Sequence, residues 1–210
     1  MQASWSNVPP APKKEIASIM SLGDKQLTYR IIGSMLQNMG DTGGKTTPFE
    51  DYNYKNLQDW FFLADSLDPK SNFIPLLAAY YYGATNVKSD LAYIVEYLSN
   101  IGVKKENKKW RWLAQAVFIA RYRMKDTKLS LKLANELASI WDVSMPVWAK
   151  QMPNIIISDM GDKEASYNFI MNLIIDDDNT LSAEEVNFMA NYLCKKILSK
   201  EEADLDPVCK

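Results

Sequence analysis

The stretch "LADSLDPKSNFIPLLAAYYYGATNVKSDLAYIVEYLSNIG", residues 63–102, decides the fold class. Its second half carries Leu91, Ile94 and Leu98 at three- and four-residue spacing, which is typical of an amphipathic α-helix. The segment "SLDPKS" at 66–71 combines residues that end one helix and begin the next. The stretch therefore predicts helices separated by short turns rather than strands.

Helical spacing continues through most of the chain from residue 14 onward, and two-residue alternation is scarce. One further apolar stripe consists of Tyr54, Leu57, Trp60, Phe61, Ala64 and Leu67. Further helix-breaking segments stand at 100–107, 142–146 and 160–163. The pattern predicts about ten helices with short loops, which is an all-α fold.

A shift of 36 residues aligns parts of the chain with one another. Two sets of residues fall in register, namely Leu76, Trp112 and Trp148, and Asp90, Asp126 and Asp162. The segments 130–138 and 166–174 also share one amphipathic face. This self-similarity favours a helical repeat, in which each hairpin buries its faces against its neighbours.

The quoted stretch resembles the tetratricopeptide class of helical repeats, including its Sel1-like relatives. The resemblance rests on Leu67-Asp68-Pro69, on the Leu-Ala and Tyr-rich helix that follows, and on the Gly or Asp turn before a second helix. "KWRWLAQAVFIARYRMKDTKLSLKLANELA" (109–138) and "WAKQMPNIIISDMGDKEASYNFIMNLI" (148–174) resemble degenerate copies. The resemblance implies stacked antiparallel helix hairpins in a right-handed α-solenoid that serves as a scaffold or adaptor.

The domain expectation follows from these boundaries. Residues 1–13 are predicted to be a flexible, Pro-rich tail, 14–200 a single helical-repeat domain, and 201–210 a C-terminal tail. Within the domain, the expected units are 72–103, 107–140 and 146–175, followed by a capping helix at 182–198.

The composition argues against catalysis. The chain of 210 residues has no histidine, the commonest general base and metal ligand. Its formal net charge is −2, without the basic excess of a DNA-binding protein. We therefore expect no enzyme activity, no cofactor, no metal and no DNA partner. No apolar run approaches the ~18 residues of a membrane span.

The segment "GDTGGKTTPFED", residues 40–51, resembles a phosphate-binding loop only superficially. The required spacing would place a glycine at position 39, where the chain has Met39. We expect instead that Thr47 caps a helix, with Pro48 at its first position and Glu50 completing a capping box.

The acidic segment 176–186 is equally poor as a calcium loop. With Glu185 as the twelfth residue, Ile174 stands at the first ligand position. A capping box of Ser182 and Glu185 is the better interpretation.

Aromatic and cationic residues supply the candidate partner-binding surface. Three successive tyrosines cannot all lie on one helical face, so one or two should be core and the rest exposed. The stretch 104–125 mixes cations and aromatic residues, although a solvated loop is the stronger interpretation for Lys104, Lys105, Lys108 and Lys109. The candidate contact residues are Tyr80, Tyr81, Tyr82, Trp110, Arg111, Arg121, Arg123 and Trp148.

The function predicted from the sequence is a non-catalytic scaffold, adaptor or accessory subunit that binds a protein partner through a helical-repeat groove. The alternative is an RNA- or small-ligand-binding module that uses the basic and aromatic stretch. Free thiols at Cys194 and Cys209 are favoured over a disulfide. A cytoplasmic location is favoured, with a membrane-associated or periplasmic one if an upstream anchor has been removed.

Overall fold

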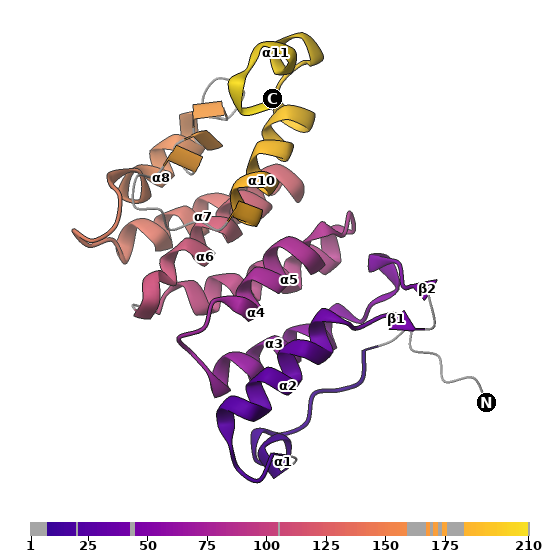
Figure 1. Ribbon diagram of the computed structural model, residues 1–210. Helices are drawn as coiled ribbons and strands as arrows, with labels where there is room; N and C mark the ends of the chain where they lie inside the picture. Colours follow the sequence, from indigo (N-terminus) through magenta and orange to yellow (C-terminus); the bar gives the residue numbers. More distant parts are fainter. Residues whose placement is uncertain are drawn as a thin grey trace. The chain divides into compact units, whose positions relative to one another are not determined.

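A computed structural model describes residues 8–19, 21–42, 45–104, 106–158, 167–168, 170–171, 174–175 and 183–209 (Figure 1). The described chain is helical apart from one pair of two-residue strands, so the all-α prediction is confirmed. It forms two compact units, 1–133 and 134–210, where the sequence predicted a single domain. We call residues 1–133 unit 1 and residues 134–210 unit 2.

Unit 1 contains successive helices that pack on their neighbours. Its α-helices are α1 (Lys14–Ile19), α2 (Lys25–Gln37), α3 (Tyr54–Leu67), α4 (Phe73–Leu76), α5 (Lys88–Gly102), α6 (Trp110–Phe118) and the start of α7 (Thr127–Ser139). Its short helical turns are η1 (Phe49–Asp51), η2 (Leu77–Tyr81), η3 (Tyr82–Ala84), η4 (Glu106–Lys108) and η5 (Ile119–Arg123). Helix α2 packs on α3, α3 on α5, and α5 on α6 (Figure 1). The predicted breaks at 66–71 and 100–107 are confirmed.

The contact between α5 and α6 is especially close because Gly102 ends α5. A Cβ at this position would overlap the backbone nitrogen and side chain of Leu113. A side chain larger than hydrogen would therefore push the two helices apart. Leu113 itself is fully buried, as are Leu98 and Ile101 on α5.

The N-terminal segment is anchored rather than free. Val8 is buried, and its carbonyl oxygen accepts a hydrogen bond of 2.7 Å from Asn56 Nδ2. The Trp60 indole donates to the carbonyl of Pro9 at 2.8 Å. The prediction of a flexible tail through residue 13 is therefore wrong for residues 8 and 9. Asn56 and Trp60 lie one turn apart on α3 and hold the segment together.

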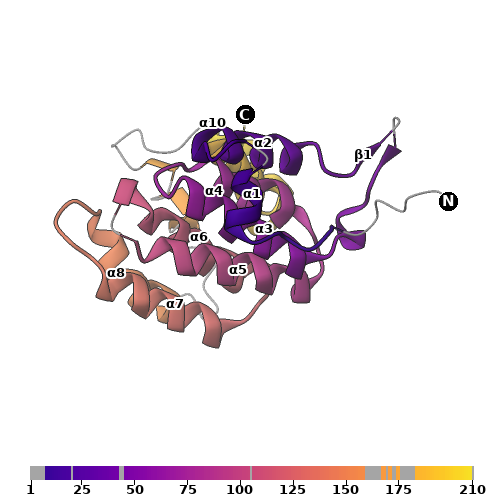
Figure 2. The ribbon, with the colours of Figure 1, turned by 90° about the horizontal axis from the view of Figure 1, so that it is seen from below.

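The helix start predicted at Thr47 is also wrong. Helix α3 begins at Tyr54, and the Asn53 side chain caps it by accepting from the Asn56 amide at 3.0 Å. Thr47 instead donates its hydroxyl to the carbonyl of Gly40 at 3.1 Å. This bond closes the hairpin of β1 (Asp41–Thr42) and β2 (Lys45–Thr46), which lies beyond the C-terminal end of α2 (Figure 2).

The helix boundaries agree with the 36-residue shift only in part. Helices α4, α6 and α8 (Val147–Ser158) begin at intervals of 37 residues, but the other boundaries differ. The first helix of each pair ends in a π-helical turn, at Tyr81 and at Arg123, and these ends are 42 residues apart. The second helices begin at Lys88 and Thr127, 39 residues apart. Asp90 lies within α5, whereas Asp126 precedes α7 and accepts from the Leu129 amide at 2.9 Å. The aligned turn aspartates are therefore not equivalent, and Asp162 lies outside the described residues.

Unit 2 contains the end of α7 together with α8 (Val147–Ser158), α10 (Ala183–Tyr192), η6 (Leu193–Ile197), α11 (Lys200–Leu205) and η7 (Pro207–Cys209). Helix α10 with η6 agrees with the predicted capping helix. The predicted tail at 201–210 is instead mostly helical, and Ser199 and Glu202 form a capping box at the start of α11. The break at 142–146 is confirmed. The predicted features at 160–163 and 176–182 lie outside the described residues.

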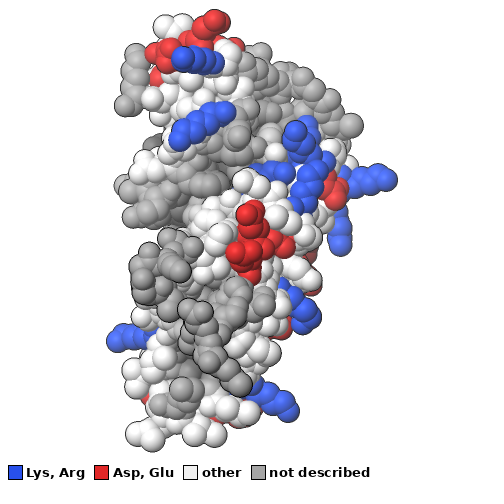
Figure 3. All heavy atoms as spheres, turned by 90° about the vertical axis from the view of Figure 1, so that its right-hand side faces the viewer, with Lys and Arg blue, Asp and Glu red and all other residues white. Residues whose placement is uncertain are grey.

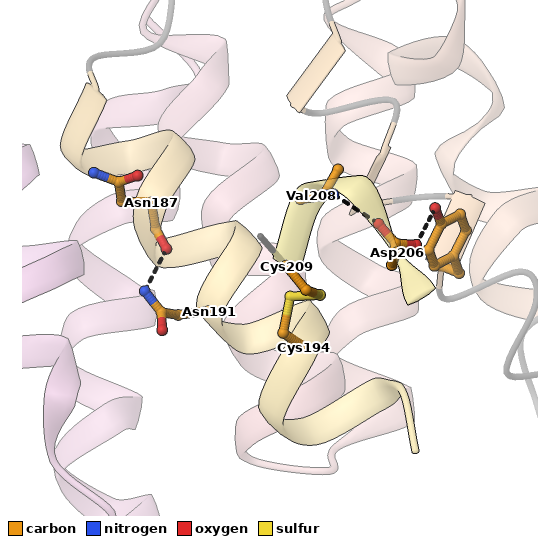
Figure 4. The surroundings of a disulfide bond; sticks show 7 residues. Asn187, Asn191, Cys194, Asp206, Val208 and Cys209 are labelled. Atoms are coloured by element: carbon orange, nitrogen blue, oxygen red, sulfur yellow. Dashed lines mark hydrogen bonds between the residues drawn. A yellow bond between two sulfur atoms is a disulfide. The ribbon is translucent and has the colours of Figure 1, made fainter. Parts of the chain in front are cut away.

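Cys194 and Cys209 form a disulfide, with their Cα atoms 5.7 Å apart (Figure 4). The expectation of free thiols is therefore wrong. The turn at Asp206 brings the end of the chain back toward η6, because its carboxylate accepts from the Val208 amide at 2.9 Å. Two cysteines that are 15 positions apart in sequence thereby become neighbours.

Candidate protein-binding surface

The three successive tyrosines have different environments. Tyr82 is fully buried, and its hydroxyl donates to the carbonyl of Leu36 at 2.6 Å. Its own carbonyl accepts from the Tyr54 hydroxyl at 2.9 Å. Burial raises the pKa of both phenols well above the ordinary value. Tyr82 is thus a core residue that satisfies a carbonyl at the end of α2.

Tyr80 and Tyr81 are half-buried. The Tyr81 ring meets Phe49 edge-to-face, with centroids 5.2 Å apart. Tyr80 packs on Trp112 with a centroid distance of 6.3 Å. Their polar tips and partly exposed rings match the amphipathic residues that anchor protein interfaces.

The two predicted tryptophans lie in different units. Trp110 is buried in unit 1, with 8% of its surface exposed, and is therefore a core residue. Trp148 is half-buried in α8 of unit 2. The candidate binding surface on unit 1 consequently includes neither of them.

Two predicted arginines stabilise the end of η5. Arg123 donates to the carbonyls of Thr85 at 2.6 Å and Ala84 at 3.3 Å. Arg121 lies 5.8 Å from the centroid of the Tyr122 ring, which permits a cation–π interaction. Both side chains are half-buried, so part of each remains at the surface.

A buried ion cluster occupies the junction of α3 and α6. The Asp65 carboxylate accepts from Lys104 and, at 3.3 Å, from Lys109. Lys109 is fully buried and also donates to the carbonyl of Ser71 at 2.6 Å. The prediction that these lysines belong to a solvated loop is therefore wrong for Lys109 and incomplete for Lys104. Two cations of the basic stretch serve the fold.

Desolvation sets the electrostatics of this cluster. Burial lowers the pKa of Lys109, and the neighbouring Asp65 opposes that shift. Burial raises the pKa of Tyr97, whose hydroxyl has no hydrogen-bond partner among the described residues. Tyr29 donates to Ser71 Oγ at 2.6 Å, and burial again raises its pKa. Full burial of Lys109 keeps it from contact with a substrate, so we assign the cluster a structural role.

Arg111 and Gln115 form an unsatisfied polar pair on α6. They are four residues apart and therefore lie on one helical face. Arg111 Nε and Nη1 are buried without a hydrogen-bond partner among the described residues. Both polar atoms of the buried Gln115 amide are in the same condition. Gln115 is a core residue, whereas the half-buried Arg111 can offer its guanidinium to a carboxylate.

Sequence reasoning singled out Arg111 but missed Gln115 and Asp65. A polar residue in the otherwise apolar run "LAQAVFIA" was the available signal for Gln115. Asp65 was harder to find because a single carboxylate in a helix is usually solvated. Among the described residues, no group of three or more Cys, Asp or Glu side chains could hold a metal ion.

The chain matches no protein-family model, and no curated protein or solved structure was found to be significantly similar to it. The tetratricopeptide-like interpretation therefore remains a prediction from the residues quoted above. None of the described helices is both long and apolar enough to span a bilayer.

Proposed function

We propose that the protein is a non-catalytic scaffold or adaptor that binds an acidic segment of a protein partner. The observation that carries this proposal is Arg111 on α6, a half-buried guanidinium whose Nε and Nη1 have no hydrogen-bond partner among the described residues. Its physical basis is that buried polar groups without partners are unfavourable, typically by about 1–3 kcal/mol each. A partner that supplies acceptors removes this cost when it binds.

The chemistry of Arg111 selects the partner class. A guanidinium presents a planar fork of donors that matches a carboxylate with two parallel hydrogen bonds. An Asp or Glu side chain of a partner segment meets this requirement.

Aromatic anchoring on unit 1 adds to the proposal. Tyr80 and Tyr81 are partly exposed on η2, and a ring neighbour supports each of them. Rings held in this way lose little conformational entropy when a partner covers them. The right-handed solenoid implied by the tetratricopeptide resemblance would present such residues along a groove, and it belongs to this proposal.

The RNA-binding alternative has less support, because Lys104 and Lys109 are engaged by Asp65. A nucleic-acid partner would need several free cations and would show a steep loss of affinity with salt.

Arrays of synthetic peptides test the proposal. Peptides containing Asp and Glu are compared with matched peptides containing Asn and Gln, with Arg111→Gln as the variant. The exposed Lys88→Gln, also in unit 1, is the charge-matched control. We expect selective binding of acidic peptides that weakens roughly tenfold or more in Arg111→Gln and stays unchanged in Lys88→Gln. Equal binding by both variants, or nuclease-sensitive capture of RNA that disappears in high salt, contradicts the proposal.

A further inference from the structure

The hairpin of α1 and α2 exposes apolar side chains that the proposed scaffold function does not use. The turn between the helices carries Leu22, which is 100% exposed, and the preceding Ile19 is 71% exposed. The other exposed aliphatic residues of this hairpin are Ile16, Leu27 and Ile31. Such a concentration of exposed aliphatic side chains usually marks a contact surface.

The backbone of the turn holds Leu22 outward. Leu22 has φ of 54°, in the left-handed region that leucine rarely adopts. The Leu22 amide donates to the carbonyl of Ile19 at 3.1 Å, and Gly23 follows with φ of 85°. The Asp24 side chain then begins α2 by accepting from the Gln26 and Leu27 amides. A tight, bonded turn therefore carries an aliphatic residue at its tip.

Cations accompany these apolar residues. Lys13, Lys25 and Arg30 are exposed and make no ion pair within the described part of the chain. The region also has two acidic residues, Asp24, which caps α2, and Glu15, which is exposed in the first turn of α1, so Lys13, Lys25 and Arg30 outnumber them. At the lower end of Figure 3, where α1 and α2 lie, most described atoms are uncharged and Lys or Arg side chains project at the margins.

We propose that the α1–α2 hairpin docks on an anionic lipid surface, with Ile19 and Leu22 inserted at the headgroup level. Peripheral membrane binding commonly needs two signals, an apolar insertion and an electrostatic attraction. Both signals are present within one hairpin of unit 1. The lysines and Arg30 face the lipid phosphates while the aliphatic tips enter the acyl boundary.

The charge pattern favours this occupant over a second copy of the chain. A symmetric pairing of two such hairpins would bring Lys13, Lys25 and Arg30 close to the same residues of the other copy. Like charges across an interface are unfavourable, whereas an anionic bilayer complements them. A projecting tip such as Leu22 also enters a fluid lipid layer without needing a shaped pocket.

Vesicle flotation tests the proposal with the full chain. The probes are vesicles of phosphatidylcholine alone and of phosphatidylcholine mixed with phosphatidylglycerol. The variant is the double substitution Ile19→Ser and Leu22→Ser, and the control is Val143→Ser, which removes an aliphatic side chain 93% exposed in unit 2. A second variant replaces Lys13, Lys25 and Arg30 with Gln. Thermal melts check that all variants are folded, as expected for exposed positions.

We expect the protein to float with the anionic vesicles only. The aliphatic double variant should bind at least tenfold more weakly, and each cation removed should weaken binding roughly fivefold. Val143→Ser should bind like the parent protein. Equal binding to both vesicle types, or undiminished binding by the double variant, overturns the proposal. It is also overturned if the double substitution only abolishes a dimer in solution, or if soluble polyglutamate binds as well as vesicles.

Discussion

Unit 1 and unit 2 are stabilised by different means. Among the described residues, the largest fully buried side chains, from Trp112 and Tyr82 to Ile94, all belong to unit 1. The described core of unit 2 consists of smaller aliphatic residues and methionines, such as Leu137, Met152 and Met189. Unit 2 has the disulfide that unit 1, without cysteines, cannot form. A rich aromatic core and a covalent link are thus alternative means of stabilising short helices.

The buried tyrosines of unit 1 have a second role besides filling its core. Buried Tyr29, Tyr52, Tyr54 and Tyr82 each donate to an oxygen from another segment, and three of these acceptors are backbone carbonyls. Two of those carbonyls, of Leu36 and Met39, lie at or just beyond the end of α2, where intrahelical partners are lacking. The tyrosines therefore bury apolar area and satisfy helix ends with the same side chain.

Alkaline pH should produce the largest difference in stability between the two units, by destabilising unit 1. Burial holds the pKa of Tyr54, Tyr82 and Tyr97 above 10, so these groups keep their protons in unit 1 after the unfolded chain has lost them. Each therefore reduces the free energy of unfolding by about 1.4 kcal/mol per pH unit above 10. The lowered pKa of Lys109 acts in the opposite direction, but it is one group and its gain ends near pH 10.5.

Subtilisin digestion at pH 8 and pH 11, with fragments identified by mass spectrometry, measures this effect. We expect new cleavage in unit 1 at pH 11. Unit 2 has one described tyrosine with a raised pKa, Tyr167, whose hydroxyl donates to Asp206. Cleavage that begins in unit 2 would show that the tyrosine core is not the sensitive element.

Asp65→Asn should be the most damaging single substitution in unit 1. It removes the negative charge beside the fully buried Lys109 and leaves that ammonium without a counter-ion. Breaking a buried pair in this way typically costs about 3–5 kcal/mol. Urea denaturation gives the change in unfolding free energy. The control Asp59→Asn breaks the exposed pair with Lys55 and should cost below about 0.5 kcal/mol. Similar losses in both variants would refute a structural role for the cluster.

Replacement of Cys194 and Cys209 with serine should weaken unit 2 by about 3 kcal/mol, the usual effect for a loop of this length. Hydrogen exchange should rise in α10 and α11 and stay unchanged in α3 and α5. The parent protein with and without dithiothreitol provides a chemical control that needs no mutation. Equal loss of protection in α3 and α5 would mean that the two units unfold together.

Gly102→Ala should destabilise unit 1 by about 1–3 kcal/mol, because the added methyl group overlaps Leu113 at the close contact of α5 and α6. Thermal denaturation measures the loss. Gly33→Ala is the matched control, because it adds the same methyl group to another helical glycine of unit 1. There the nearest atom to a new Cβ is the end of the Phe73 ring, which is partly exposed and has room to move. A larger effect at Gly33 would contradict this ranking.

Asn53→Ala should have the smallest effect of the series, about 1 kcal/mol, because it removes the cap of α3. Glu50→Ala is the matched test of the capping box expected from the sequence. Glu50 is exposed and lies in η1, not in the first turn of α3, so its replacement should leave the melting temperature unchanged. The reverse order in thermal melts would restore the original expectation for this segment.

Local signals in the sequence were sufficient for helix content and for most boundaries. Pro69 and the apolar stripe of α5 are local signals, because each involves residues only a few positions apart. Helix α3 ends just before Pro69, and α5 forms where the stripe lies. The start of α3 was misplaced because Thr47 and Asn53 are both good capping residues, and only the hairpin bond to Gly40 decides between them. The 36-residue shift agrees to within one residue with the starts of α4, α6 and α8, and it differs from the other helix boundaries because the helices and the turns between them vary in length.

Features that depend on distant segments could not be predicted. Lys109 lies in a run of lysines and resembles a solvated residue until Asp65, 44 positions away, is brought beside it. The disulfide depends on the turn at Asp206. Of the predicted contact residues, Trp110 is buried, and Tyr82 is buried with its ring against Tyr52 and against Phe61 of α3. Periodicity identifies an apolar face but does not say which partner covers it.

The anchoring of Val8 and Pro9 on α3 has a consequence for the order of folding during synthesis. Their hydrogen-bond partners, Asn56 and Trp60, lie 48 and 51 positions later in the chain. Val8 and Pro9 are therefore synthesised before α3 and dock only after it has been made, whereas α5 and α6 are neighbours in sequence and can pack on each other soon after synthesis. Contacts of long sequence separation form late because they close large loops. The segment of Val8 and Pro9 is thus made before α3 and completes its contacts after that helix has formed.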